Sequence, residues 1–165
     1  MGDSILRALA VTLMLLPAAA FGQGERPACA LMKGLDLKQL LGADHDAPVP
    51  FGQDSCRAES NAPGKLIVLG VIEGKPAELK TWLSGIKQGN ATERAKEVTV
   101  VAEPALGPDA FSVRQQRDMR ELEIYASKGT RVIVLQVSWP RSAPIGDAGL
   151  KQFLQLTKLA LDKLP

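Results

Sequence analysis

Residues 106–139 read LGPDAFSVRQQRDMRELEIYASKGTRVIVLQVSW, three runs of alternating polar and apolar residues separated by two turns. In the second run Leu122 and Ile124 alternate with Glu121 and Glu123, which is the period of a half-buried strand. The third run places an unbroken apolar row on one face: Ile133, Leu135, Val137 and Trp139. A Lys-Gly turn joins these two runs, so the whole stretch predicts an antiparallel meander.

The segments on either side of this stretch alternate between helical and strand periods. The strand expected at 65–72 has, after Lys65, seven apolar residues without alternation, which predicts that both of its faces are covered. Helices are expected at 34–41, from about 76 onward and from about 147 to 164, with strands at 53–59 and 97–103 and a loop at 43–51. The predicted fold class is α+β, in which a largely antiparallel sheet of about six strands packs against an N-terminal, a middle and a C-terminal helix.

Length and composition favour one domain of ordinary charge. The chain has 165 residues, of which 45% are hydrophobic, enough to bury a sizeable core. Twenty Lys and Arg face eighteen Asp and Glu, for a net charge of +2. The sequence has neither a basic run nor aromatic residues interleaved with basic ones, which argues against a nucleic-acid partner.

The N-terminal residues 1–22 have the pattern of a secretory signal peptide. Arg7 precedes an apolar run at 9–16, and Ala20 and Gly22 place small residues before a cleavage site at Gln23. A membrane anchor is the alternative, but the apolar run is well short of the ~20 residues that span a bilayer. We therefore expect a single mature domain at 23–165, periplasmic or secreted, without an integral membrane segment. The residues before Cys29 do not form a lipidation box.

Export gives the two cysteines a simple interpretation. Cys29 and Cys56 are expected to form a disulfide that closes a loop of about 28 residues, because disulfides persist in oxidising compartments. The alternative is two free thiols in a metal or redox site. Their wide separation, the single His of the chain and the lack of a Cys-x-x-Cys motif argue against it.

The search for catalytic chemistry finds no recognisable motif. The single His is His45, flanked by Asp44 and Asp46 in a Pro-rich loop, where the ligand number and spacing fall short of a metal site. Glu121 and Glu123 project to one strand face, and we interpret them, with Arg114 and other nearby cations, as a solvated charge ladder rather than an acid-base pair. We therefore expect no catalytic residues, no metal and no cofactor. A hydrolase using His45 with Glu121 and Glu123 is the least supported alternative.

Two motifs carry a family resemblance. Residues 29–42 contain Cys29, Ala30, Leu31, Met32 and then Leu40, Leu41, Gly42, which resembles the Cys-x-Leu-Leu...Leu-Gly opening of a group of secreted bacterial envelope proteins of unknown function. Residues 106–111, Leu-Gly-Pro-Asp-Ala-Phe, resemble that group's Leu-Gly-x-x-Ala-Phe element, and Lys128 and Gly129 its Lys-Gly hairpin. Lys33 stands where the family has a capping Ser, Thr or Asp, and many family members are lipoproteins. The resemblance implies a PsbP-like, non-enzymatic fold and assigns no ligand.

Two functions remain open at this point. The first is a monomeric, non-catalytic envelope module that binds another protein through the open face of the sheet or through the loop after the first helix. The second is a carrier of a small molecule or lipid, with Trp82, Tyr125 or Trp139 lining a cavity between the sheet and the helices.

Overall fold

The computed structural model describes residues 26–61, 64–73, 76–89, 98–115 and 119–164, so the expected signal peptide at 1–22 and its cleavage after Gly22 lie outside the described residues. Within these ranges the helices are α1 (Pro27–Lys33), α2 (Lys38–Leu41), α3 (Pro76–Gly89), the short 3-10 helix η2 (Pro104–Leu106) and α4 (Asp147–Lys163). None of these helices has the length and apolar character needed to cross a bilayer.

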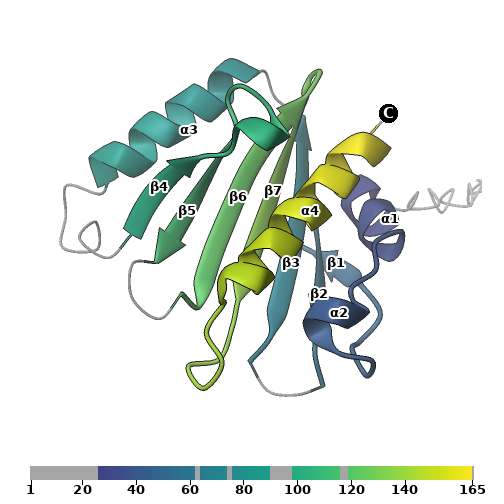
Figure 1. Ribbon diagram of the computed structural model, residues 1–165. Helices are drawn as coiled ribbons and strands as arrows, with labels where there is room; N and C mark the ends of the chain where they lie inside the picture. Colours follow the sequence, from purple (N-terminus) through teal and green to yellow (C-terminus); the bar gives the residue numbers. More distant parts are fainter. Residues whose placement is uncertain (1–25, 62–63, 74–75, 90–97, 116–118, 165) are drawn as a thin grey trace, which may run out of the picture.

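One sheet of seven antiparallel strands organises the molecule, which confirms the α+β class (Figure 1). The strands are β1 (Val49–Phe51), β2 (Ser55–Glu59), β3 (Leu66–Glu73), β4 (Val98–Ala102), β5 (Phe111–Gln115), β6 (Glu121–Lys128) and β7 (Arg131–Ser138). Their order in space is β1-β2-β3-β7-β6-β5-β4. The sheet therefore consists of two meanders, β1 to β3 and β4 to β7, joined by α3.

The two most apolar strands meet at the centre of this sheet. β3 and β7 pair over their full lengths, from Leu66 opposite Ser138 to Glu73 opposite Arg131. Each of the two strands has a hydrogen-bonded neighbour on both sides, α1 packs on β3, and α4 and α3 pack on opposite faces of β7. Residues 67–71 of β3 are all buried, as the continuous apolar run predicts.

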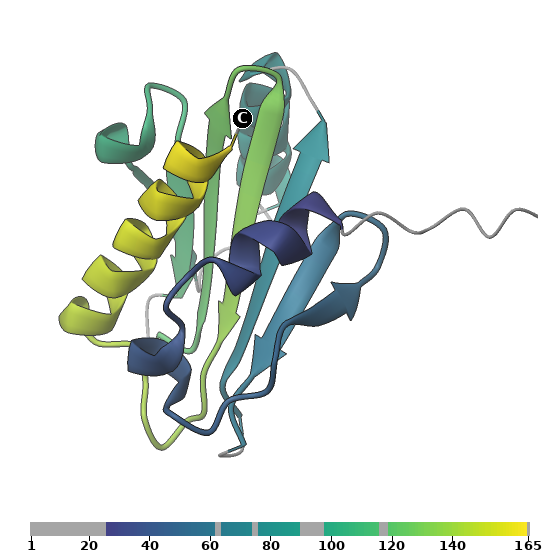
Figure 2. The same cartoon turned by 90° about the vertical axis from the view of Figure 1, so that its right-hand side faces the viewer.

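α4 and α1 cover one face of the sheet. α4 packs on β6 and β7, and α1 lies beside it on β2 and β3. Figure 1 shows α4 in front of the strands with α1 to its right, and Figure 2, turned toward the β1 edge, shows α4 on one side of the strands. Phe153 and Ala160 of α4 and Met32 of α1 meet the inward residues Ile133 and Leu135 in the larger core cluster.

α3 covers part of the opposite face. Leu79 of this helix is fully buried against Phe111 and Val132, and Trp82 and Leu83 pack on the same smaller cluster. Val132 and Ile133 are neighbours in β7 and point to opposite faces, so the two core clusters lie on the two sides of one sheet.

The N-terminal helix differs from its predicted bounds. Instead of one helix at 34–41, the chain forms α1 from Pro27, with Pro in the first turn where its missing N–H costs nothing, and then the short α2. Gly34 ends α1, and Leu40 and Leu41 of α2 are buried. The expected disulfide is present, and Cys29 and Cys56 tie α1 to β2 with a Cα–Cα distance of 5.0 Å.

The seventh strand is the element that the sequence did not predict. Residues 43–51 were expected to be a loop because Pro48 and Pro50 interrupt them, but Val49–Phe51 forms β1 at the edge of the sheet. An edge strand tolerates proline because one of its sides forms no ladder hydrogen bonds. The sheet therefore has seven strands rather than about six.

Candidate functional site

The uncovered part of the α3 side of the sheet is the surface best suited to bind another molecule. α3 packs mainly on β6 and β7, toward the β4 half of the sheet. Beyond it, the outward residues of β1, β2 and β3 continue the same face, together with the ends of β6 and β7. We call this surface the open face: Val49, Phe51, Ser55, Arg57, Glu59, Leu66, Val68, Gly70, Glu121, Glu123, Gln136 and Ser138.

Two large apolar side chains are exposed at the outer end of the open face. Phe51 is 46% exposed and Val49 is 44% exposed, and both lie on β1. Their side chains share a face because Val49 and Phe51 stand two residues apart on one strand. Exposed apolar side chains that are adjacent are more informative than scattered ones, since such patches mark contact surfaces.

The guanidinium group of Arg57 contacts the exposed apolar pair at Phe51. The guanidinium carbon of Arg57 lies 5.7 Å from the centroid of the Phe51 ring. The same side chain approaches the Glu59 carboxylate, with 3.2 Å between Nη1 and Oε1. Arg57 therefore faces the aromatic ring and a carboxylate at once, a combination that orients Phe51 without covering it.

A cluster of aromatic side chains lies at the other end of the open face. Tyr125 stacks on Phe111 with 4.7 Å between ring centroids, and Trp82 of α3 meets Tyr125 edge-on at 6.1 Å. In the strand register, Tyr125 of β6 is paired with Val134 of β7. Val134 is paired with Gly70 of β3, and Gly70 is paired with Ser55 of β2. A row of small side chains thus runs from Tyr125 toward Phe51.

Two carboxylates lie beside this row on β6. Glu123 accepts a hydrogen bond from the Tyr125 hydroxyl, and Glu121 accepts one from Nε2 of Gln115 at 3.4 Å. Burial of the phenol, together with its hydrogen bond to Glu123 and the negative charge of that group, raises the pKa of Tyr125 well above its ordinary value. The phenol therefore stays protonated and serves as a donor to Glu123 at neutral pH.

The predicted charge ladder around Arg114, Glu121 and Glu123 is divided between the two faces. Arg114 stands opposite Leu122, a fully buried residue of the α4 side, whereas Val113 stands opposite Glu123. The expectation placed Arg114 on the outward face with the carboxylates. The register of β5 against β6 puts it on the other side of the sheet.

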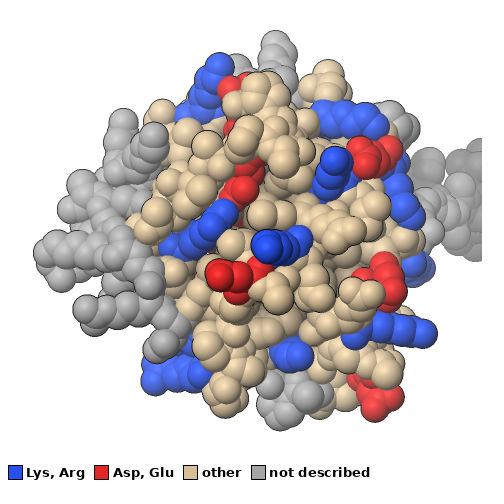
Figure 3. All heavy atoms as spheres, in the orientation of Figure 1, with Lys and Arg blue, Asp and Glu red and all other residues tan. Residues whose placement is uncertain are grey.

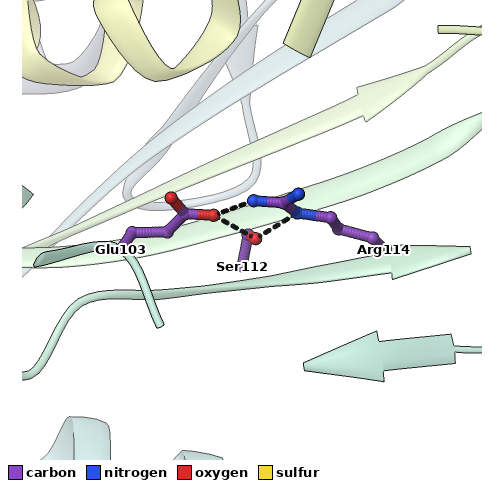
Figure 4. A network of polar contacts seen from close by, with 3 residues as sticks. All are labelled: Glu103, Ser112 and Arg114. Atoms are coloured by element: carbon purple, nitrogen blue, oxygen red, sulfur yellow. Dashed lines mark hydrogen bonds and ion pairs between the residues drawn. The ribbon is translucent and has the colours of Figure 1, made fainter. Parts of the chain in front are cut away.

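Arg114 instead belongs to a buried polar network (Figure 4). Ser112 Oγ donates to Glu103 Oε1 at 2.6 Å and accepts from Arg114 Nε at 2.8 Å, and Arg114 Nη2 also contacts Glu103 Oε1. Ser112 is fully buried and Glu103 is 8% exposed. Each polar group has a partner, so the network fixes the segment before β5 and offers no free nucleophile.

The loop around His45 connects α2 to β1 and lies beside the end of β2. Nδ1 of His45 lies 3.0 Å from the carbonyl oxygen of Gly42, and His45 forms a bridge to Ser60. The backbone of Asp46 donates to Glu59. Within the described part of the chain, no group of three His, Cys, Asp or Glu side chains is arranged to hold a metal ion. In the strand order of the sheet, β3 and β7 lie between β2, which is next to His45, and β6, which carries Glu121 and Glu123.

The three aromatic residues considered for a carrier cavity occupy two different places. Trp82 and Tyr125 pack on the α3 side, whereas Trp139 packs edge-on against Phe153 of α4 with ring centroids 5.1 Å apart. The ammonium of Lys65 lies 5.4 Å from the centroid of the Trp139 ring. Trp139 therefore does not line one space with the other two residues.

The α4 side of the molecule has a different surface. Basic and acidic side chains are interspersed over it in Figure 3. Leu159 of α4 is 45% exposed, close to the exposure of Phe51, but its helix neighbours Lys158 and Ala160 are charged or small. Leu159 therefore provides a matched reference for an exposed apolar residue outside the open face.

Sequence reasoning missed Phe51 and Val49 as surface features because it assigned them to a loop. A usable signal was present, since two large apolar residues that alternate with prolines fit a short edge strand. Comparison of the chain with protein-family models, curated proteins and solved structures gives no match.

Proposed function

We propose that this chain is an exported, non-catalytic accessory domain of the bacterial envelope that binds another envelope protein through the open face. The observation that carries the proposal is the pair of exposed apolar side chains, Phe51 and Val49, set beside Arg57 on a sheet face that α3 covers only in part. Aromatic residues and arginine are enriched in protein interfaces and contribute most of the binding energy there.

Two features support an extracytoplasmic location. The Cys29–Cys56 disulfide is of the kind that persists outside the reducing cytosol. The leader pattern at 1–22 belongs to the same proposal, with a periplasmic or secreted mature domain. Neither feature depends on the identity of the partner.

The resemblance to secreted envelope proteins with a PsbP-like fold is part of the proposal. Its motifs lie at structural positions: Cys29 in the disulfide, Gly42 at the end of α2 and Gly107 after η2. A non-catalytic role agrees with the network of Glu103, Ser112 and Arg114, whose polar groups satisfy one another.

The test is site-specific photo-crosslinking in the bacterial host. A photoreactive phenylalanine analogue replaces Phe51 in the full chain, and in a matched variant it replaces Leu159, which is equally exposed. We expect one covalent adduct of defined mass from position 51 and none from position 159. Adducts of equal yield at both positions, or none at position 51, would contradict binding through the open face.

A second step gives the strength of the contact. Once mass spectrometry has identified the cross-linked protein, its affinity for the purified chain is measured directly. Phe51→Ala should weaken binding about thirtyfold, the loss expected of an interface hot spot of ~2 kcal/mol, while Leu159→Ala leaves the affinity unchanged. Both residues are exposed, so neither change should impair folding.

Native mass spectrometry distinguishes the carrier alternative. A carrier purified from the periplasm retains a ligand of defined mass, whereas an accessory domain has the mass of the oxidised chain alone. A retained ligand that is lost in Trp82→Ala would replace the proposed function with a carrier function. This measurement also reports whether the chain is the expected monomer.

A further inference from the structure

We infer that the open face takes an extended segment of its partner that is both basic and apolar. This inference rests on the proposed function and adds the chemistry of the partner. It follows from the charges of the open face, from its dimensions and from the chemistry of β1.

The described charges of the open face are mostly negative. Glu59, Glu121 and Glu123 contribute three carboxylates, and Arg57 contributes one cation, which already approaches Glu59. The chain as a whole carries a net charge of +2. The open face therefore has the opposite sign to the rest of the molecule.

Among the described residues, the hydrogen bonds to the two carboxylates of β6 come from neutral donors. Glu123 is bonded to the Tyr125 hydroxyl and Glu121 to the Gln115 amide. Both partners donate a hydrogen bond but carry no positive charge that would neutralise the glutamates. A lysine or arginine of a bound segment would meet these two carboxylates, whereas an acidic segment or the phosphates of a nucleic acid or a lipid would be repelled by them.

Apolar contacts lie within reach of the same segment. Phe51 marks one end of the row and Tyr125 the other, with Gly70 and Ser55 between them. The two aromatic residues are four strand spacings apart, a span of about 19 Å at ~4.8 Å per spacing. An extended segment of about six residues covers that distance at ~3.3 Å per residue.

The edge of β1 is poorly suited to the alternative of strand addition. β1 has three residues, and its central residue Pro50 has no N–H to donate. A partner strand would gain few ladder hydrogen bonds there. The contact therefore falls on the side chains of the open face rather than on the backbone of its edge.

The test uses two synthetic peptide probes and the oxidised, full mature domain. In the first peptide Lys alternates with Val or Phe, and in the second Glu replaces every Lys. Backbone amide shifts are followed by NMR during titration. We expect the Lys peptide to shift the amides of Phe51, Arg57, Val68 and Gln136 in a salt-dependent way, and the Glu peptide to leave them unchanged.

A charge-neutralised variant tests the role of the carboxylates. Glu121→Gln combined with Glu123→Gln preserves shape and hydrogen bonding and should weaken the Lys peptide roughly fivefold, as expected for two exposed ion pairs. Asp162→Asn, an exposed carboxylate on α4, should have no effect and serves as the control. Equal binding of both peptides, shifts centred on α4, or an unchanged affinity in the double variant would overturn the inference.

The results of these tests distinguish failure of this inference from failure of the proposed function. A cross-link from position 51 that persists at full yield in the Glu121→Gln, Glu123→Gln variant supports the accessory function and overturns the basic partner. Selective binding of the Lys peptide without any cross-link in the host supports the chemistry of the face and overturns the accessory function.

Discussion

The hydroxyl of Tyr125 in β6 donates a hydrogen bond to the carboxylate of Glu123, two residues earlier on the same face of the same strand. The phenol is half-buried between Phe111 and Trp82, so ionisation would place a second negative charge beside Glu123 in a poorly solvated position. Burial and this neighbour together raise the pKa of Tyr125 above its ordinary value.

The first prediction is a loss of stability at alkaline pH that depends on Tyr125. In the unfolded chain the phenol ionises at a pKa of about 10, whereas in the folded chain it stays protonated, so the free energy of unfolding falls as the pH rises above about 10. Tyr125→Phe lacks this dependence. At neutral pH the variant should be less stable by about 1 kcal/mol, since it loses a hydrogen bond to a charged acceptor. Urea denaturation at several pH values measures both effects.

A direct titration checks the same point. The chain contains one tyrosine, so the ultraviolet absorbance of the ionised phenol reports on Tyr125 alone. The folded protein should show no ionisation until the pH is well above 10, and the protein in urea should titrate near 10. Ionisation of the folded protein near its ordinary pKa would contradict the buried arrangement.

The central part of the fold was predictable because its sequence periods are unambiguous. Ile133 and Leu135 alternate with polar or smaller residues, which identified β7 and its inward face, and the apolar run 66–72 identified β3 as a buried strand. The class, the presence of N-terminal, middle and C-terminal helices and the disulfide were predictable from the sequence, but the bounds of the N-terminal helix were not. It did not reach the order of strands, since the pairing of β3 with β7 joins residues far apart in the chain.

The candidate site was less predictable, for two physical reasons. Both faces of β5 are covered, so the alternation of Ser112 and Arg114 with Phe111 and Val113 does not reveal which residues face outward. At β1 the prolines predict a loop, and only the edge position, a tertiary property, makes a strand possible. Phe51 became a surface residue of interest only once β1 was placed beside β2.

The second prediction concerns the disulfide between α1 and β2. Replacing Cys29 and Cys56 together by Ala removes a cross-link between residues 27 positions apart. Chain-entropy reasoning gives a loss of about 3 to 4 kcal/mol in the free energy of unfolding. Urea denaturation should give the same loss for the wild-type chain in excess dithiothreitol. A loss below about 1 kcal/mol in both experiments would show that the bridge contributes little to stability.

The third prediction concerns the buried polar network. Ser112→Ala removes the hydroxyl that joins the Glu103 carboxylate to the Arg114 guanidinium, and leaves a buried carboxylate with one donor fewer. We expect a loss of about 1 to 3 kcal/mol in the free energy of unfolding. Ser84→Ala, which removes an exposed hydroxyl on α3, is the control and should stay within about 0.5 kcal/mol. Equal effects of the two changes would mean that the network is not a stabilising feature.

The fourth prediction concerns the close approach of Gly64 to Pro140. Gly64 has a φ of +92°, and a Cβ at this position would lie 3.0 Å from Cβ of Pro140. Gly129 also has a positive φ, of +60°, but no atom lies within 4 Å of its added Cβ. Gly64→Ala should therefore cost about 1 kcal/mol more than Gly129→Ala, because it adds a steric clash to the backbone strain.

A double-mutant cycle isolates this clash from the strain. Pro140→Gly removes the Cβ that the new side chain would meet, so it should recover part of the stability lost in Gly64→Ala and none of that lost in Gly129→Ala. Each free energy of unfolding comes from urea denaturation of the single and double variants. Additive effects of Gly64→Ala and Pro140→Gly would show that the added Cβ does not clash with residue 140, and would leave the positive φ as the whole reason for glycine at position 64.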